Sequence, residues 1–198
     1  KILATVLAKL SNFIPEGGIW MNTQRPEWND ANNALVGNGV SAVTLYYLYR
    51  FLTFAQVIFQ TSKIEKVPIS IELKVFLDHV INTLDDHKDL LSGDINDKVR
   101  KQIMDGLGEA GSTYRQQIYN NSFKGEKQEI LLTELVKLTE LGLQYAGETI
   151  KANKRTDNLY HAYNLMSVVG EHEVSISHLS EMLEGQVAVL SSGYLSGD

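Results

Sequence analysis

The sequence predicts an all-α protein built from antiparallel helical hairpins. Several long segments repeat apolar residues at the i, i+3, i+4, i+7 spacing of an amphipathic helix. Turn residues separate these segments, and no two stretches show the alternating pattern of a convincing strand pair. We expect about six long helices and two irregular segments, residues 15–38 and 154–178, within one helical domain that spans residues 1–198.

The composition is that of an ordinary soluble globular protein. The chain has 198 residues, of which 43% are hydrophobic and 21% are charged. A net charge of -6 disfavours nucleic acid as a partner, because phosphate binding needs clustered cations. Since cysteine is absent, disulfides, thiolate nucleophiles and cysteine-ligated metals are excluded. The composition does not indicate a cellular compartment.

The first half of the chain contains three expected helices. Residues 2–14 end at Pro15, and residues 40–60 are apolar nearly all round, so other helices should enclose them. Because residues 40–60 include Arg50 and have no basic flank, we interpret them as a buried helix and not as a membrane span. Ser70 is a plausible N-cap for a third helix, which has one polar face.

Three more helices are expected in the second half. The first begins near Asn96 or Asp97, runs to about residue 120 and contains three glycines, which indicate either close helix packing or a break. Residues 126–153 form the next, and residues 179–190 form the last, which ends at residues 191–193.

The stretch of residues 16–39 is where we expect chemistry. It combines two tryptophans, an arginine, the carboxylate pair of Glu27 and Asp30, and five asparagines. Glu27 and Asp30 are three residues apart and can divide their titration as an acid and a base, or Asp30 or Asn29 can simply cap a helical turn. Trp20 and Trp28 are suited to stack on sugar rings, and they are equally suited to a core.

The run RPEWNDANNALVGNG resembles a loop of the (α/α)6 six-hairpin glycosidase-like proteins. It is similar in particular to the Trp-Asn-Asp-Gly motif of the cellobiose phosphorylase family, whose aspartate is the general acid. Trp28, Asn29 and Asp30 match that motif, whereas Ala31 replaces its glycine. The resemblance implies that Asp30 lies at the mouth of a helical toroid and protonates a glycosidic oxygen.

Further segments resemble parts of large bacterial proteins that carry such a toroid. These segments are IPEGGIWMNTQRPEWNDANNALVG, DNLYHAYNLM and MLEGQVAVLSSG. A full toroid has twelve helices and this chain provides about half of them, so the resemblance implies a partial toroid. The rest of a longer parent chain is then an expected partner.

A second carboxylate is needed for hydrolysis with inversion, because it must activate water across the sugar ring. Glu171, Glu173 and Glu184 are the candidates. In a phosphorylase, phosphate takes this role and needs a basic pocket, for which Arg25 is the only cation in the loop. The histidines lack the spacing of a helical zinc site, so we expect no metal and no cofactor.

Our leading hypothesis is a glycoside hydrolase or phosphorylase with an oligosaccharide substrate and Asp30 as its general acid, with Glu27 and Glu184 as the other catalytic candidates. The expected substrate-binding residues are Trp20, Arg25, Trp28, Asn29, Asn32, Asn33, Tyr160 and His161. The alternative is a non-catalytic helical domain that binds carbohydrate or another protein. An open pocket beside Asp30 favours the enzyme, whereas an exposed apolar face on the long helix indicates a missing neighbour.

Overall fold

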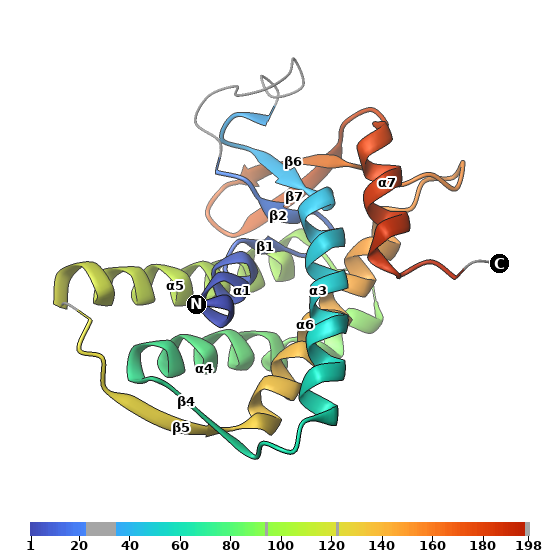
Figure 1. Cartoon of the computed structure of the whole chain (residues 1–198). Helices are drawn as coiled ribbons and strands as arrows, with labels where there is room; N and C mark the ends of the chain where they lie inside the picture. Colours follow the sequence, from blue (N-terminus) through green and yellow to red (C-terminus); the bar gives the residue numbers. More distant parts are fainter. Residues whose placement is uncertain (23–34, 94, 122, 197–198) are drawn as a thin grey trace.

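The protein is a mixed structure in which a curled antiparallel sheet lies against a group of helices (Figure 1). The computed structural model describes residues 1–22, 35–93, 95–121 and 123–196. It is 58% helical and 18% strand. The expected all-α fold and the partial (α/α) toroid are therefore wrong, because both segments expected to be irregular contain paired strands.

Six α-helices and one short 3-10 helix account for the helical part of the described chain. Their bounds are α1 Ile2–Leu10, α3 Ala42–Thr61, α4 Ile71–Asp86, η1 Lys88–Ser92, α5 Asp97–Asn121, α6 Leu132–Ala152 and α7 Leu183–Ser192. Each long helix predicted from apolar spacing is present, although α6 and α7 begin several residues later than expected.

The larger sheet has five strands in the order β1-β2-β3-β6-β7, and every neighbouring pair is antiparallel. The strands are β1 Phe13–Ile14, β2 Gly18–Trp20, β3 Gly39–Ser41, β6 Tyr163–Val169 and β7 Glu173–His178. Three of them have only two or three residues, which is too short to show an alternating pattern in the sequence. β1 and β2 form a short hairpin, and β2–β3 and β3–β6 pairing then joins it to segments that are distant in the chain.

Gly18 is required where β2 follows β1. Its backbone has φ of +125°, a conformation that side chains rarely adopt, and a Cβ atom there would lie 2.6 Å from the carbonyl oxygen of Ser41 on β3. The glycine thus allows β2 and β3 to approach closely.

A second, two-stranded sheet joins β4 Lys66–Ser70 to β5 Lys127–Leu131. Each strand leads directly into a helix, β4 into α4 and β5 into α6, and because the strands are antiparallel the two helices begin at opposite ends of the ribbon (Figure 1). The residues of β5 were expected to begin the helix over residues 126–153. That expectation is wrong, because β4 and β5 satisfy their backbone groups by pairing with each other.

The helix ends follow the predicted chemistry more closely. The hydroxyl of Ser70 accepts a hydrogen bond from the backbone N–H of Leu73, which confirms it as an N-cap. The side-chain oxygen of Asn96 accepts from the N–H groups of Lys98 and Val99, so Asn96 is the cap of α5. Gly193 ends α7 in the left-handed conformation.

The glycines of α5 divide into two kinds, and the helix runs through them without a break. Cβ atoms at Gly106 and Gly111 would lie 2.8 Å from Thr83 and 2.6 Å from Ser11, so these glycines permit close packing against α4 and the end of α1. A Cβ at Gly108 would meet no atom within 4 Å, because this face of the helix borders an open pocket.

Arg100 fastens α5 to the sheet and the segments beside it. Its buried guanidinium donates hydrogen bonds to the carbonyl oxygens of Pro15 at 3.1 Å, Val174 at 2.7 Å and Ile95 at 2.9 Å. The same group forms ion pairs with Glu16 and Asp97. Because five acceptors surround one buried cation, its charge is well compensated.

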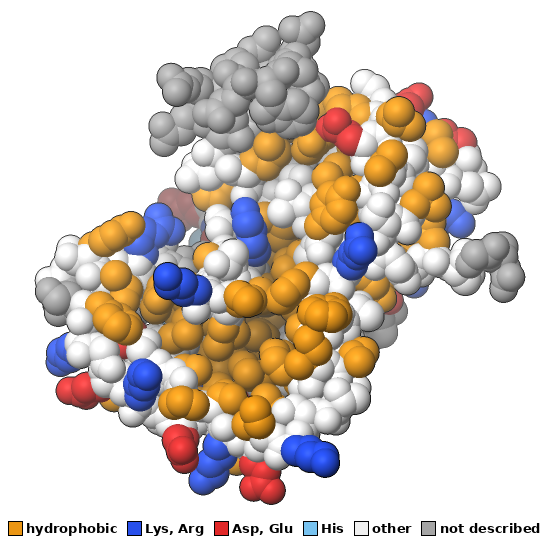
Figure 2. Space-filling view, in the orientation of Figure 1, with side chains coloured by type: hydrophobic (Ala, Val, Ile, Leu, Met, Phe, Trp, Pro, Cys, Tyr) orange, Lys and Arg blue, Asp and Glu red, His pale blue; other side chains and the backbone are white. Residues whose placement is uncertain are grey.

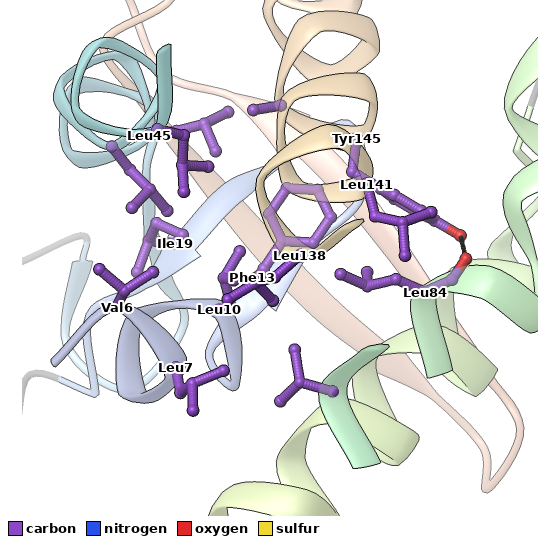
Figure 3. Close-up of a cluster of buried hydrophobic side chains, with 14 of the residues drawn as sticks. Val6, Leu7, Leu10, Phe13, Ile19, Leu45, Leu84, Leu138, Leu141 and Tyr145 are labelled. Atoms are coloured by element: carbon purple, nitrogen blue, oxygen red, sulfur yellow. Dashed lines mark hydrogen bonds between the residues drawn. The ribbon is translucent and has the colours of Figure 1, made fainter. Parts of the chain in front are cut away.

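One hydrophobic core joins the sheet to the helices (Figure 3). The side chain of Phe13 from β1 meets the ring of Tyr145 from α6 edge to face, with ring centroids 6.0 Å apart. The Tyr145 hydroxyl donates a hydrogen bond of 2.8 Å to the carbonyl oxygen of Leu84, which satisfies the polar atom of a buried ring. The core therefore connects α1, β1, α4 and α6 in one packed unit.

Helix α3 is less enclosed than its sequence predicts. Its inner face is buried, but Phe54, Val57 and Ile58 are 62%, 56% and 47% exposed. Among the helices described, α3 alone is long and apolar enough to cross a membrane, and 33% of that apolar window is buried. The expected full enclosure is wrong, because no described element covers the outer face.

Candidate functional site

Four of the predicted site residues lie in the described parts of the chain, and they fall into two separate places. Trp20 lies on β2, beside a pocket formed with α5. Tyr160, His161 and Glu184 lie together where the chain enters β6 and where α7 begins. The remaining predicted residues, Arg25, Glu27, Trp28, Asn29, Asp30, Asn32 and Asn33, lie outside the described residues.

The pocket beside Trp20 has a volume of about 320 Å3 and a mixed polar and apolar lining. The end of α1 contributes Ser11 and Asn12, the sheet contributes Ile14, Trp20 and Met166, and α5 contributes the rest. The residues from α5 are Met104, Asp105, Gly108, Glu109, Ser112 and Arg115. Only Trp20 of this set was expected in a site.

Trp20 is held in a defined orientation. Its indole N–H donates a hydrogen bond of 2.8 Å to the carbonyl oxygen of Gly37. Its ring also packs against the small apolar cluster of Ile14, Val40 and Met166. The side chain is only partly buried, so part of the indole borders the pocket. A fixed, half-exposed aromatic ring is a suitable surface for the apolar face of a ligand.

The α5 wall supplies the charged groups. Asp105 and Glu109 are four residues apart, so their carboxylates lie on one side of the helix. Lys101 forms an ion pair with Asp105 at the edge of the pocket. Gly108 lies between the two acids in the sequence and leaves the space above the helix empty, and Arg115 adds a cation one to two turns further along. The wall therefore offers both hydrogen-bond acceptors and a donor.

A sequence signal for this wall existed. The sequence analysis singles out the three glycines of α5 but does not identify Asp105 and Glu109 as site residues, although these acids flank Gly108 at helical spacing. By itself, a small residue between two acids on one helix face is weak evidence for a binding site. It becomes informative only when tertiary structure brings Trp20 opposite, and Trp20 is separated from these acids by most of the chain's first half.

The second group of polar residues is centred on Tyr163 and Glu184. A hydrogen bond to the Glu184 carboxylate and burial raise the pKa of the Tyr163 hydroxyl, with burial as the larger cause. One oxygen of Glu184 is buried and has no hydrogen-bond partner among the described residues. Tyr163 also packs against Leu35, the residue that directly follows residues 23–34. Through Tyr163, the Glu184 carboxylate therefore lies close to Leu35, the first described residue after residues 23–34.

Two imidazole rings stack beside this group. The rings of His161 and His178 are nearly parallel, with an angle of 5° between their planes and centroids 3.9 Å apart. Burial, the neighbouring His178 and Arg155 lower the pKa of His161, and desolvation and Arg155 lower the pKa of His178. Both rings are consequently neutral at pH 7.

Hydrogen bonds determine which nitrogen of His178 carries the proton. The amide nitrogen of Asn164 donates to the carbonyl oxygen of Gly17 at 2.6 Å and to the side-chain oxygen of Asn153 at 2.8 Å. The amide oxygen of Asn164 therefore faces His178 Nδ1, which lies 2.7 Å away and must be the donor. His178 is held as the Nδ1–H tautomer, with a lone pair on Nε2.

The other predicted acids and histidines do not join either group. Glu171 and Glu173 are exposed at the turn between β6 and β7, and His172 lies exposed between them. Tyr160 exchanges two backbone hydrogen bonds with the side chain of Gln186, which fixes it to α7. In the part of the chain that the structure describes, no three histidine, aspartate or glutamate side chains gather as ligands for a metal ion.

Comparison with models of known protein families gives no match, and comparison with curated proteins gives none.

Proposed function

We propose that this chain binds carbohydrate, and that the sugar lies in the pocket beside Trp20. The observation that carries the proposal is the juxtaposition of a fixed, half-exposed indole with two carboxylates across an open pocket of about 320 Å3. A pyranose has an apolar face and a rim of hydroxyl groups, so it needs both an aromatic surface and hydrogen-bonding side chains. Trp20, Asp105 and Glu109 provide these.

The chemistry of the lining favours a neutral sugar over a charged one. Asp105 and Glu109 accept hydrogen bonds from hydroxyl groups, whereas Asn12 and Arg115 donate them. Because the lining contains both carboxylates and a guanidinium, neither an anion nor a cation is favoured over its whole surface. The pocket volume is at the lower end of the range for ligand sites, which fits one or two sugar units.

The test is a screen of neutral oligosaccharides followed by titration of the best ligand. Trp28→Phe leaves Trp20 as the only tryptophan, so its fluorescence reports binding directly. Gly108→Leu places a side chain in the open space above α5 and is expected to weaken binding at least tenfold. Asn82→Leu, at an exposed position of α4 that does not line the pocket, is the control and should leave binding unchanged.

Asp105→Asn combined with Glu109→Gln tests the polar contacts while keeping the shape of the pocket. The double variant should bind the same sugar at least tenfold more weakly, because amides replace the two charged acceptors. Binding that survives both this variant and Gly108→Leu would show that the sugar lies elsewhere. A complete screen without any ligand would refute the proposal.

A second candidate function is cleavage of a glycosidic bond with Asp30 as the general acid. It depends on the Trp-Asn-Asp motif at Trp28 to Asp30, and the position of Glu184 supports it. Within the described part of the chain one oxygen of Glu184 has no hydrogen-bond partner, and Tyr163, which bonds to Glu184, packs against Leu35, close in the chain to Asp30. The toroid that the motif implied is absent, so the motif and this proximity are the remaining support.

The decisive measurement is hydrolysis of chromogenic glycosides with and without phosphate. Loss of activity in both Asp30→Asn and Glu184→Gln supports the catalytic role, and a phosphate requirement identifies phosphorolysis. Full activity of Asp30→Asn removes Asp30 from the mechanism. Because this result does not depend on the pocket beside Trp20, the two candidate functions are tested independently.

A further inference from the structure

An apolar groove lies between α1, α3, β4 and α6, on a different side of the core from the pocket beside Trp20. Its volume is about 380 Å3, and Figure 2 shows it as a hollow surrounded by hydrophobic side chains. Val6, Leu52 and Leu135 form the buried floor, while Phe54 and Ile58 stand at the exposed rim. We propose that this groove binds an amphipathic helix of another polypeptide, with acidic residues beside its apolar face.

The spacing of apolar residues on α3 indicates a helical ligand. Tyr47, Phe51, Phe54 and Ile58 are separated by four, three and four residues, so they form one stripe along the helix. Phe51, Phe54 and Ile58 line the groove, and Tyr47 continues the stripe beyond it with 47% of its surface exposed. This is the pattern that one helix presents to another in a packed pair.

The lining excludes other classes of ligand. Among the residues that the structure describes, no charged side chain lines the groove, and Thr139 is the one polar residue in its lining. A sugar, a nucleotide or a metal ion would therefore find no adequate set of partners there. A lipid bilayer is flat on the scale of one protein side chain, so it would contact the rim and leave the floor unfilled. A helix is convex and can place side chains into the hollow.

Charge at the rim indicates acidic residues on the partner. Lys1 and Arg50 are exposed, and each directly adjoins a lining residue in the chain, whereas Lys66 forms an ion pair with Glu129 on β5. Figure 2 shows lysine and arginine side chains around the hollow. Glu140 adjoins Thr139, so the rim also includes an acid. The chain as a whole has a charge of -6, so a surplus of cations at this groove is a local feature.

The same charge argues against a second copy as the occupant, because two molecules of charge -6 repel one another. The chain does carry a candidate ridge for self-association, since Leu183, Val187 and Leu190 on α7 are exposed at helical spacing. The experiment therefore includes the oligomeric state.

The probe is a designed amphipathic peptide with leucines at positions i, i+4, i+7 and i+11 and glutamates beside them. Binding is measured by fluorescence anisotropy against a version with lysines in place of the glutamates and a version with serines in place of the leucines. The glutamate peptide should bind at least tenfold more tightly than either. Equal binding of all three, or none, overturns the proposal.

Phe54→Glu tests the location, because this exposed side chain is replaceable without opening the core. It should weaken binding of the glutamate peptide at least tenfold, whereas Leu190→Glu on α7 is a matched control that should change it less than twofold. Lys1→Glu combined with Arg50→Glu should weaken binding of the glutamate peptide and strengthen binding of the lysine peptide. Unchanged peptide preference in that double variant contradicts the stated charge of the partner.

Two further outcomes would assign the groove to a different occupant. A dimer measured by light scattering that Phe54→Glu converts to a monomer would show that a second copy fills it. Preferential binding to vesicles of phosphatidylcholine and phosphatidylserine, again abolished by Phe54→Glu, would show that the surface binds a membrane. Either result overturns the proposal of a helical partner.

Discussion

Asn164 is the residue on which the polar interior of the sheet depends. It is fully buried, and its amide connects Gly17, Asn153 and His178. Asn153 in turn donates to the carbonyl oxygen of Glu16 at 2.9 Å. These hydrogen bonds satisfy the carbonyl groups of the turn between β1 and β2, which no strand partner reaches.

Replacing Asn164 should therefore be costly. Asn164→Leu leaves the Gly17 carbonyl and the His178 N–H without partners, and we expect a loss of about 2 to 4 kcal/mol in the free energy of unfolding. Urea denaturation followed by circular dichroism measures it. Asn82→Leu, on the exposed face of α4, is the matched control and should change stability by less than about 0.5 kcal/mol. A similar loss in both variants would contradict the role assigned to the buried amide.

The stacked histidines predict a dependence of stability on pH. The folded state lowers the pKa of both His161 and His178 below the value near 6.5 that an unfolded chain shows. Below pH 6.5 the unfolded state thus binds more protons, and the free energy of unfolding falls as the pH falls towards the folded-state pKa values.

Urea denaturation at pH 7.5 and pH 5.5 measures this effect, because carboxylates change little over that range. The double variant His161→Phe, His178→Gln should lose less stability between the two pH values than the unmodified protein. His172→Gln, which replaces an exposed histidine in the β6–β7 turn, should keep the original difference. If the double variant keeps it too, other groups cause the dependence.

At the scale of the element, α5 shows how one residue type has opposite roles on two faces of a helix. Gly108 borders open space, whereas Gly111 is pressed against Ser11 at the end of α1. Helix propensity favours alanine over glycine at both positions by up to about 1 kcal/mol. The surroundings decide whether that gain is realised.

Gly108→Ala should raise the free energy of unfolding by about 0.5 to 1 kcal/mol, since nothing obstructs the added methyl group. Gly111→Ala should lower it by about 1 to 3 kcal/mol, because the new Cβ would lie 2.6 Å from the Ser11 hydroxyl. Thermal and urea denaturation compare the two. Ser11→Gly should recover much of the loss in Gly111→Ala, and failure to do so would place the strain elsewhere.

The strands show where element prediction failed. Helices of 16 to 25 residues repeat their pattern over several turns, and four of them were found from the sequence. The strands β1, β2 and β3 contain two or three residues each, so no period exists to be detected. Strand β6 ends in exposed valines, Val168 and Val169, which pair with β7 without burying an apolar face.

At the scale of the whole molecule, the shared core predicts cooperative unfolding. Ile19 from the sheet and residues from all six α-helices belong to one buried cluster. In the Trp28→Phe protein, tryptophan fluorescence reports only Trp20 on the sheet, whereas circular dichroism at 222 nm reports mainly the helices. The two urea transitions should coincide. Separate midpoints would show that the sheet and the helices unfold independently.

The groove and the pocket belong to this same scale, since neither exists within one element. The pocket requires Trp20 on β2 to lie opposite Asp105 on α5, and the groove requires α1 to lie beside α3. Sequence reasoning therefore placed Trp20 in a candidate site but missed the acids opposite it. The sequence also predicts that α3 is enclosed. This prediction is wrong, because the number of apolar residues in a helix does not show which neighbouring elements cover it.

Local sequence alone determined the long helices, the Ser70 cap and the glycine that ends α7, because each depends on residues within one or two turns. Tertiary structure alone decided the five-stranded sheet, the pocket beside Trp20 and the uncovered face of α3. These features join residues far apart in the chain, and their stability comes from pairing and packing that no local pattern encodes.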